Sequence, residues 1–406
     1  MPSSNQGRAC GRTFIIIAAL ASAGPLAAQP LTESEAIERA LAQPELGALG
    51  EANRAEAEAR VSGIRRFDNP EVEVSRESAS GDGRDETEWR LGVVQPIDIS
   101  GRRSRLRAAA RAELGAVEYD SARRRQERIG QVRRAYASCA AAVEKVRITA
   151  RFVERLREAE RIVSARASAG DAAVYDLRRL RVEARTAEAQ MALQEGEIRA
   201  ECATLAALTG EADARPTASL ILLTSSLRPG AAEAVRPDLA AREQRLTAAS
   251  EQVRAAERAR LPDLAVGVGV LHVRSSEGSA TGPAVSLRMR VPLFDGGGAA
   301  VAEARARLRA REAELGLARR EVHAAVAAAE ARSTAAIEAA ERAQSAAEDA
   351  RRLGPIAEAA YQGGEGGVVE LVDAFRAARD AELEIVDHLE RALLARVELD
   401  LARGAN

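Results

Sequence analysis

The chain repeats itself once, and this internal repeat constrains the fold more than any other feature of the sequence. Five short segments of the first half recur in the second half, in one order and at spacings of 192 to 196 residues. The clearest pairs are NPEVEV at 69–74 with LPDLAV at 261–266, and GDAAVYDL at 170–177 with GEGGVVEL at 364–371. We therefore expect each half to form the same unit: a short helix, a strand pair, a very long helix, a tip and a long returning helix.

Each half contains two neighbouring segments in which apolar and polar residues alternate, at about 70–97 and about 262–293. Val72 and Val74 alternate with Glu71 and Glu73, and the segment 285–291 alternates in the same way. A period of two predicts strands with one apolar face, against lipid or a core, and one face in water. A small soluble sheet is the alternative, but it does not explain the very long helix after each pair.

Long stretches with few helix-breaking residues follow both strand pairs. Residues 102–167 contain no proline, and at about 1.5 Å per residue they would span about 100 Å. Residues 299–361 repeat this helix, and helices at 171–209 and 368–402 return along the first two. Aromatic residues make up 2% of the chain and charged residues 30%, which is typical of long, solvent-exposed helices that pack through alanine.

The first 28 residues resemble an export signal. Arg8 and Arg12 precede an apolar core at 13–20, and Leu26-Ala27-Ala28 is an acceptable cleavage site. Cys10 lies before the apolar core and so cannot be the acylated cysteine of a lipoprotein. A retained N-terminal anchor is the alternative. We expect a mature chain with a first repeat at 29–210, a linker at 211–235 and a second repeat at 236–404.

No catalytic or metal-binding pattern is found in the sequence. His272, His323 and His388 lie far apart, and neither a phosphate-binding loop nor a nucleophile elbow is present. The net charge of −2 does not favour nucleic acid as a partner. The sequence thus predicts a protein that is not an enzyme and that needs no cofactor, so any transport energy must come from a partner.

Two cysteines occupy matching levels of the first expected helical hairpin. Cys139 lies 31 residues before Gly170 and Cys202 lies 32 residues after it, so the two are level to within about 1.5 Å along the hairpin. A disulfide is chemically allowed in an oxidising compartment. The alternative is two buried small residues that face different neighbours.

The order of these motifs resembles the TolC family of outer-membrane efflux proteins over residues 29–404. The segment from Tyr361 to Gly364, leading into VVELVDAFRAA, carries the resemblance best. The segment 95–113 is similar to the CzcC-type branch that serves heavy-metal and other cation exporters, whereas FDGGGAA at 294–300 is closer to drug-efflux members.

This resemblance implies a mainly α-helical fold with a membrane β-barrel portion, located in the outer membrane and spanning the periplasm. It implies a homotrimer in which a twelve-stranded barrel stands on a twelve-helix tunnel, because four strands per chain are too few to close a barrel. The implied partners are outer-membrane lipid, a periplasmic adaptor and an inner-membrane RND pump, or an ABC exporter in the protein-secretion variant.

The resemblance also implies roles for two groups of residues near the tips. Glu370 and Asp373 share a helix face just after the second tip, where the family keeps carboxylates around the inner constriction. Their first-repeat counterparts are Asp176 and Arg179. Such carboxylates would give a cation-preferring aperture, although an ordinary solvated acidic face is the alternative. The segment GGEGG before Val368 has no basic residue to hold a closed state, so we expect a loose gate.

The tips themselves are expected to dock the adaptor, and the residues concerned are Gly170, Asp171, Gly364 and Glu365. They would otherwise be simple connectors. Two functions of other classes stay open: a periplasmic coiled-coil scaffold without a pore, and a soluble lipid-binding protein with amphipathic helices. The first would not need apolar strand faces, and the second would need helix faces less interrupted by Arg and Glu.

Overall fold

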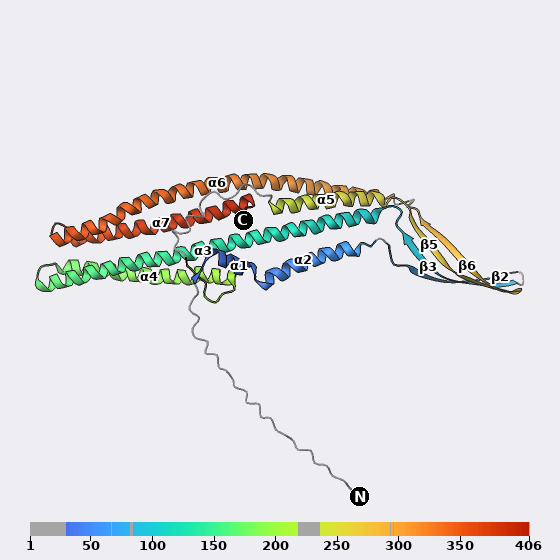
Figure 1. Ribbon diagram of the computed structural model, residues 1–406. Coiled ribbons are helices and arrows are strands. Elements are labelled where there is room, and N and C mark those ends of the chain that lie inside the picture. Colours follow the sequence, from blue (N-terminus) through green and yellow to red (C-terminus); the bar gives the residue numbers. More distant parts are fainter. Residues whose placement is uncertain are drawn as a thin grey trace, which may run out of the picture.

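The computed structural model describes residues 30–65, 67–81, 84–217, 236–292, 294 and 296–405. Within these ranges the chain is an elongated body with helical hairpins at one end and a sheet at the other (Figure 1). The expected signal peptide and its cleavage site lie outside the described residues, as does all of the expected linker except 211–217.

The two halves of the chain contain the same five elements in the same order. Those of the first half are α2 (Pro44–Gly63), β2 (Glu71–Gly81), β3 (Arg84–Ile97), α3 (Arg102–Ala169) and α4 (Val174–Thr209). Those of the second half are α5 (Pro237–Arg258), β5 (Asp263–Ser275), β6 (Gly278–Arg290), α6 (Gly298–Gly363) and α7 (Val368–Arg403). Three short elements precede or join them: β1 (Pro30–Leu31), α1 (Glu33–Leu41) and β4 (Arg215–Pro216).

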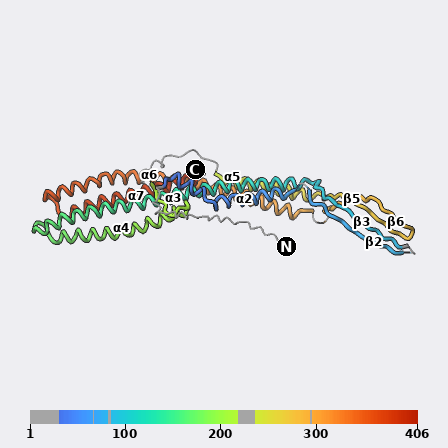
Figure 2. Tube along the Cα trace, turned by 60° about the horizontal axis from the view of Figure 1, so that its bottom comes forward, coloured from blue at the N-terminus to red at the C-terminus, as the bar shows by residue number. Residues whose placement is uncertain are grey.

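Glycines end the two longest helices at the tips. Gly170 and Gly364 have φ angles of 86° and 74°, a left-handed conformation that glycine adopts without a steric penalty and that commonly closes a helix. Their backbone N–H groups are bonded to carbonyls of the last helical turn. Because both long helices stop at repeat-related glycines, the α3–α4 and α6–α7 tips lie at the same end of the molecule (Figures 1 and 2).

The two repeats share one four-stranded antiparallel sheet in the order β2-β3-β5-β6. Each repeat contributes a hairpin, and the halves are joined where β3 pairs with β5, for example Val93 with Val268. The sheet therefore continues past the boundary between the repeats and has β2 and β6 at its edges.

Two apolar clusters hold the helices together. The larger lies around the middle of α3, where the buried Tyr136 donates a hydrogen bond of 2.9 Å to the backbone oxygen of Leu31. The second lies near the tips and joins α3, α4 and α7 through residues such as Phe152, Leu180 and Phe375. A small buried cluster between α3 and α5 consists of alanines, which let the helix axes approach closely.

The fold class predicted from the sequence is confirmed: strand pairs alternate with long antiparallel helical hairpins in two repeats. The expected helix at 299–361 contains Pro355, and α6 continues through this residue to Gly363. The structure contains one chain, so it does not include the contacts of the expected trimer. Among the described residues, no helix is long and apolar enough to cross a membrane.

Candidate functional site

One face of the sheet is apolar and exposed across all four strands. Directly opposed residues of antiparallel strands lie on the same face, and the register aligns rows such as Val72, Val93, Val268 and Val285. The row toward the hairpin turns is Val74, Leu91, Val270 and Pro283. Val285 is 80% exposed and Leu287 is 67% exposed. Exposed apolar rows of this extent indicate a surface that another apolar phase covers.

The opposite face of the sheet is polar. Its residues include Glu73 on one edge strand and Arg288 on the other, and the Arg288 guanidinium donates a hydrogen bond of 2.9 Å to the Glu73 carboxylate. Between these edges lie Gly92 and Gly269, which pair with each other. A Cβ at Gly269 would come within 2.3 Å of the Leu91 carbonyl oxygen. Because Gly92 and Gly269 have no side chains, the strands can approach closely here. This close approach allows Arg288 on one edge strand to reach Glu73 on the other.

The helical end presents the two tips with the residues predicted to dock a partner. Gly170, Asp171, Gly364 and Glu365 are all exposed. The N–H of Asp171 donates to the carbonyl of Arg166, and the N–H of Glu365 donates to that of Ala360, both at 2.9 Å. These bonds fix the backbone of each tip and leave both acidic side chains at the surface.

The three carboxylates predicted for the constriction have different surroundings in the single chain. Glu370 accepts a hydrogen bond of 3.0 Å from the Gly367 N–H and so caps the start of α7. Asp373 is exposed and lies 3.9 Å from the Arg179 guanidinium of α4. Asp176 is half-buried in the first turn of α4. The repeat-related positions 179 and 373 therefore face each other as an ion pair.

A stronger tie between the two hairpins lies three residues further along α7. The Arg376 guanidinium donates to both carboxylate oxygens of Glu183 on α4, one of them at 2.6 Å from Nε. This hydrogen bonding raises the pKa of Arg376 above its ordinary value. The side chain of Glu183 is only 9% exposed, so it depends on Arg376 for its partner.

This tie is not evident from the loop ahead of α7, which has no basic residue, because Arg376 lies within the helix. A usable signal was the acid on the otherwise apolar buried stripe of α4, formed by Leu180, Glu183, Ala184 and Ala187. An acid in such a stripe requires a cationic partner from a facing helix.

A second acidic residue joins three helices further from the tips. Glu382 on α7 accepts hydrogen bonds of 2.9 Å from Arg151 on α3 and from Arg351 on α6. Burial alone would raise the pKa of Glu382, but these hydrogen bonds and the two positive charges outweigh burial and hold the pKa below its ordinary value. The first hairpin is thus connected to both helices of the second.

The two cysteines of the first hairpin are bonded in the structure. The Cys139 and Cys202 sulfurs are 1.93 Å apart and the Cα atoms 4.9 Å apart. Cys139 is fully buried and Cys202 nearly so. The covalent bridge joins α3 to α4 within the larger apolar cluster.

The histidines do not form a site. His272 Nδ1 lies 2.8 Å from the Thr281 hydroxyl on the neighbouring strand. His388 lies 3.7 Å from Glu384 in the same helix, and His323 lies on another helix, α6. Over the described part of the chain, no three His, Cys, Asp or Glu side chains are placed to hold a metal ion.

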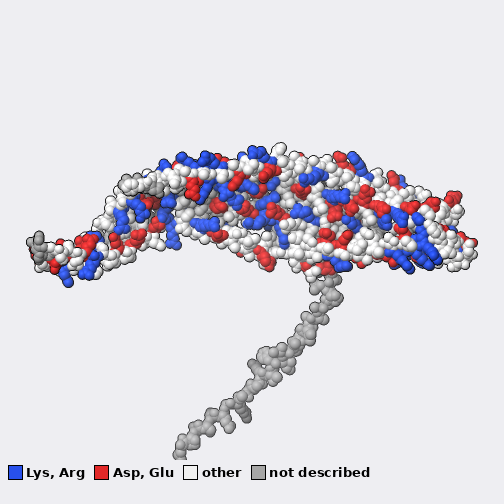
Figure 3. Space-filling view, turned by 180° about the vertical axis from the view of Figure 1, so that it is seen from behind, with Lys and Arg blue, Asp and Glu red and all other residues white. Residues whose placement is uncertain are grey.

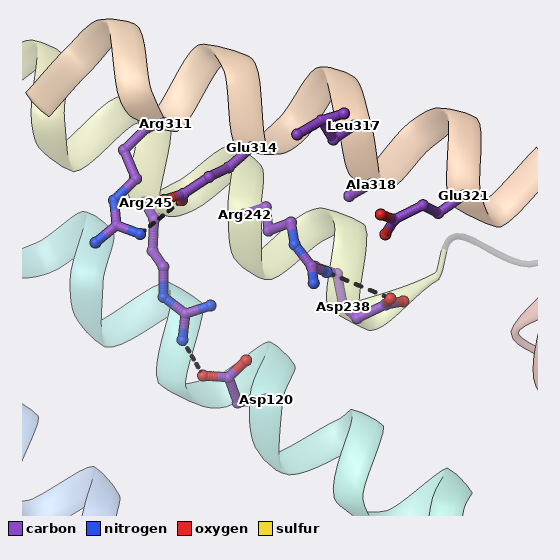
Figure 4. A pocket seen from close by; sticks show the side chains of 9 residues that line it. All are labelled: Asp120, Asp238, Arg242, Arg245, Arg311, Glu314, Leu317, Ala318 and Glu321. Atoms are coloured by element: carbon purple, nitrogen blue, oxygen red, sulfur yellow. Dashed lines mark hydrogen bonds and ion pairs between the residues drawn. The ribbon is translucent and has the colours of Figure 1, made fainter.

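A cleft of about 500 Å³ lies between α3, α5 and α6. Figure 4 shows that its charged side chains point toward one another, with Arg245 paired to Asp120 and Arg242 to Asp238. Burial raises the pKa of Asp238, but its bonds to Arg236 and the nearby positive charges lower it more, and the net pKa is below its ordinary value. The charged groups of the cleft are thus largely occupied by one another as ion pairs on α3, α5 and α6.

Charged side chains of both signs are interspersed over the face of the helical body that Figure 3 shows. Most long-range pairs join neighbouring helices, as Lys145 of α3 does with Asp387 and Glu390 of α7. The surface of the helical body is therefore suited to contact with water, whereas the sheet carries the large exposed apolar face.

A comparison with family models gives one match. The model for outer membrane efflux proteins matches residues 28–211 and 229–405, which is nearly the whole of both repeats. No curated protein matches the chain.

Solved structures with the same fold cover almost the entire chain. The channel-forming protein CusC is 19% identical with a TM-score of 0.77, over 95% of this chain and 96% of CusC. The outer membrane protein VceC of Vibrio cholerae is 20% identical with a TM-score of 0.71, over 92% and 96%. The CmeC outer membrane channel of Campylobacter jejuni is 17% identical with a TM-score of 0.69, over 99% and 94%.

Proposed function

Because the chain belongs to the outer membrane efflux protein family, we propose that it is the exit duct of a tripartite efflux system. Members of this family are outer-membrane channels and not enzymes. The observation that carries the proposal is the division of one chain into an exposed apolar sheet face and helical hairpins that extend from it in one direction (Figure 1). One helix of 68 residues would reach about 100 Å from the membrane.

The sheet supports assembly of three copies. Four strands are about half the number in the smallest membrane barrels, and unpaired strand edges in lipid leave backbone groups without partners. Three sheets joined edge to edge would give a twelve-stranded barrel with the apolar face toward lipid and the polar face toward the pore. The helical hairpins of the three chains would then form the tunnel below it.

The carboxylates after the second tip are proposed to line the inner mouth. Glu370, Asp373 and Asp176 from three chains would gather negative charge there and attract cations. The Arg179 guanidinium beside Asp373 reduces the contribution of that residue, so Glu370 is expected to carry most of the effect. The ties from α4 to α7, rather than the loop, supply the basic groups that hold the closed mouth.

The tips are proposed to bind a periplasmic adaptor, which connects the duct to an inner-membrane pump of the RND type. Cysteines introduced as Asp171→Cys and Glu365→Cys should cross-link to the adaptor in whole cells. Glu277→Cys at the β5–β6 turn serves as the control from the opposite end. Cross-links from the control position alone would reverse the proposed orientation.

Planar-bilayer conductance tests the duct itself. The purified mature protein should form pores that prefer cations and that polyvalent cations block from the helical side. The double variant Glu370→Ala with Asp373→Ala should lose the preference and the block. Absence of pores would refute the duct, whereas pores with unchanged selectivity in the variant would refute only the placement of the constriction.

A further inference from the structure

The apolar face of the sheet ends at one level on all four strands. The last apolar row is Val74, Leu91, Val270 and Pro283, and the next row toward the hairpin turns is Arg76, Trp89, His272 and Thr281. One row further lie Ser78, Thr87, Arg274 and Ser279. We call these two rows the polar collar. On all four strands the residues of this face switch from apolar to polar at the same level. We infer that the medium in contact with the face changes from apolar to polar at that level.

The first collar row lies two residues beyond the last apolar row on every strand, so alternation places it on the apolar side, and contacts between its members agree with a shared face. The Arg76 guanidinium lies 5.2 Å from the centre of the Trp89 ring. His272 Nδ1 lies 2.8 Å from the Thr281 hydroxyl. Trp89 is 46% exposed, and tryptophan with arginine is the pair that favours the boundary between hydrocarbon and lipid headgroups.

The charges near the collar are segregated between the two faces. The collar has two arginines, Arg76 and Arg274, and among the described residues neither takes part in an ion pair. The acids at the same level, Glu77, Glu86 and Glu88, alternate with the collar residues and so lie on the polar face. On the collar side, the described strands carry one acid, Asp85, and the β5–β6 turn adds the exposed Glu277, but both lie nearer the hairpin turns than the two collar rows. The collar is therefore a net basic surface directly beside an apolar one.

The height of the collar fits a membrane boundary. From Leu264 to His272 the strand rises about 27 Å, and a tilt of about 40° reduces this to about 21 Å, close to the apolar height of about 25 Å in outer-membrane strands. The collar lies on the side of the hairpin turns, away from the helices (Figure 1). With the helices in the periplasm, the collar faces the outer leaflet.

We propose that the polar collar binds phosphate groups on the glycolipid headgroups of the outer leaflet. This inference rests on the proposed function, because it requires the apolar face to be in the membrane. Arg76 and Arg274 supply charge-assisted hydrogen bonds to phosphate, and Trp89 contacts the sugar and the upper acyl region. Three chains would repeat the collar around the channel and anchor it at a fixed depth.

Trp89 is the only tryptophan of the sequence, so its fluorescence reports directly on the collar. The mature protein in a nonionic detergent would be titrated with bisphosphorylated lipid A, and a saturable change in emission is expected. Dephosphorylated lipid A should bind at least about tenfold more weakly, because it lacks the groups that arginine recognises. An equal response to the dephosphorylated lipid, or to inorganic phosphate alone, would overturn the proposal.

Variants locate the binding within the sheet. Arg76→Gln with Arg274→Gln should weaken lipid A binding about tenfold or more, whereas Arg290→Gln on the polar face should leave it unchanged. Since Arg76 itself lies over Trp89, the single variant Arg274→Gln is included and is expected to weaken binding about threefold with unaltered starting emission. Wild-type affinity in the double variant would refute the collar as the binding surface.

Conductance of the same preparation separates this inference from the proposed function. Pores without phosphate-dependent lipid binding would leave the duct in place and refute the collar. A preparation without pores would refute the duct, and with it the reason for placing the collar in a membrane.

Discussion

Replacing Arg376 with alanine is expected to shift the inner mouth toward its open state. The Arg376 guanidinium is bonded to both oxygens of Glu183 and lies 3.8 Å from Asp373. It therefore ties the start of α7 to α4, that is, the second hairpin to the first. If the mouth opens by separation of the two hairpins, this tie is present only in the closed state.

The free-energy cost of losing the Arg376–Glu183 pair depends on how far each of the two side chains is exposed to water. Removing one partner of a fully buried pair costs about 3–5 kcal/mol, and removing one of an exposed pair costs about 0–1 kcal/mol. The Glu183 side chain is 9% exposed and that of Arg376 is 41% exposed, so water would partly rehydrate the abandoned carboxylate. We expect about 2 kcal/mol per subunit, which raises the ratio of open to closed hairpins roughly thirtyfold.

Single-channel recordings in planar bilayers measure this ratio as the open fraction. The matched control is Arg352→Ala on α6, where the arginine pairs with Asp349 of the same helix and both side chains are more than three-quarters exposed. The control should behave as the wild type. Thermal unfolding of both variants shows whether the change is confined to the mouth.

A double-mutant cycle with Glu183→Ala tests the reasoning most directly. Loss of both partners removes the stranded charge, so the double variant should open less than the two single effects predict together. An open fraction for Arg376→Ala that equals that of Arg352→Ala would refute the tie as a closing element. Strictly additive effects would show that the two residues do not act through each other.

Three further predictions concern assembly, the disulfide and acid. The mature protein should be a trimer in mild detergent, and a well-behaved monomer that keeps its strand signal would contradict the assembly. Thiol counting of the denatured, unreduced protein should find neither Cys139 nor Cys202 free, and Cys139→Ser should lower the free energy of unfolding by about 4 kcal/mol for a bridge spanning 63 residues. Because the folded pKa of Glu382 lies below its ordinary value of 4.5, its stabilising effect is present above that pH and lost as the pH falls toward the folded pKa. Unfolding midpoints of wild type and Glu382→Gln should therefore differ at pH 7 and converge as the pH falls from 4.5 toward the folded pKa, and a constant difference would contradict the tie.

The order of elements could be predicted from the sequence because each depends on local or repeated signals. Alternation at Val72 and Val74 identifies a strand, Gly170 and Gly364 mark the tips, and the repeat transfers each assignment to the other half. The level of Cys139 against Cys202 follows from the rise of a helix alone. None of these inferences depends on which side chains meet between helices or strands that are far apart in the sequence.

The contacts between hairpins could not be predicted in the same way. Over thirty residues, small departures from 3.6 residues per turn accumulate until the facing side of a helix is uncertain. Arg376 therefore could not be assigned to Glu183, nor Glu382 to Arg151 and Arg351, before the helices were placed. The pairing of β3 with β5 was equally hidden, because the sequence indicates two hairpins but not which edges meet.

The covalent bridge between α3 and α4 has a consequence for the fate of a damaged tip. A protease that cuts the exposed backbone at Asp171 would leave both fragments attached through Cys139 and Cys202, and the nick would become visible only on a reducing gel. The second hairpin has no such bond among the described residues, so a cut at Glu365 would release a C-terminal fragment as soon as the chain is denatured. After a cut at the first tip the two helices stay covalently joined, whereas the described helices of the second hairpin are held by apolar packing and by ion pairs such as Arg351 with Glu382.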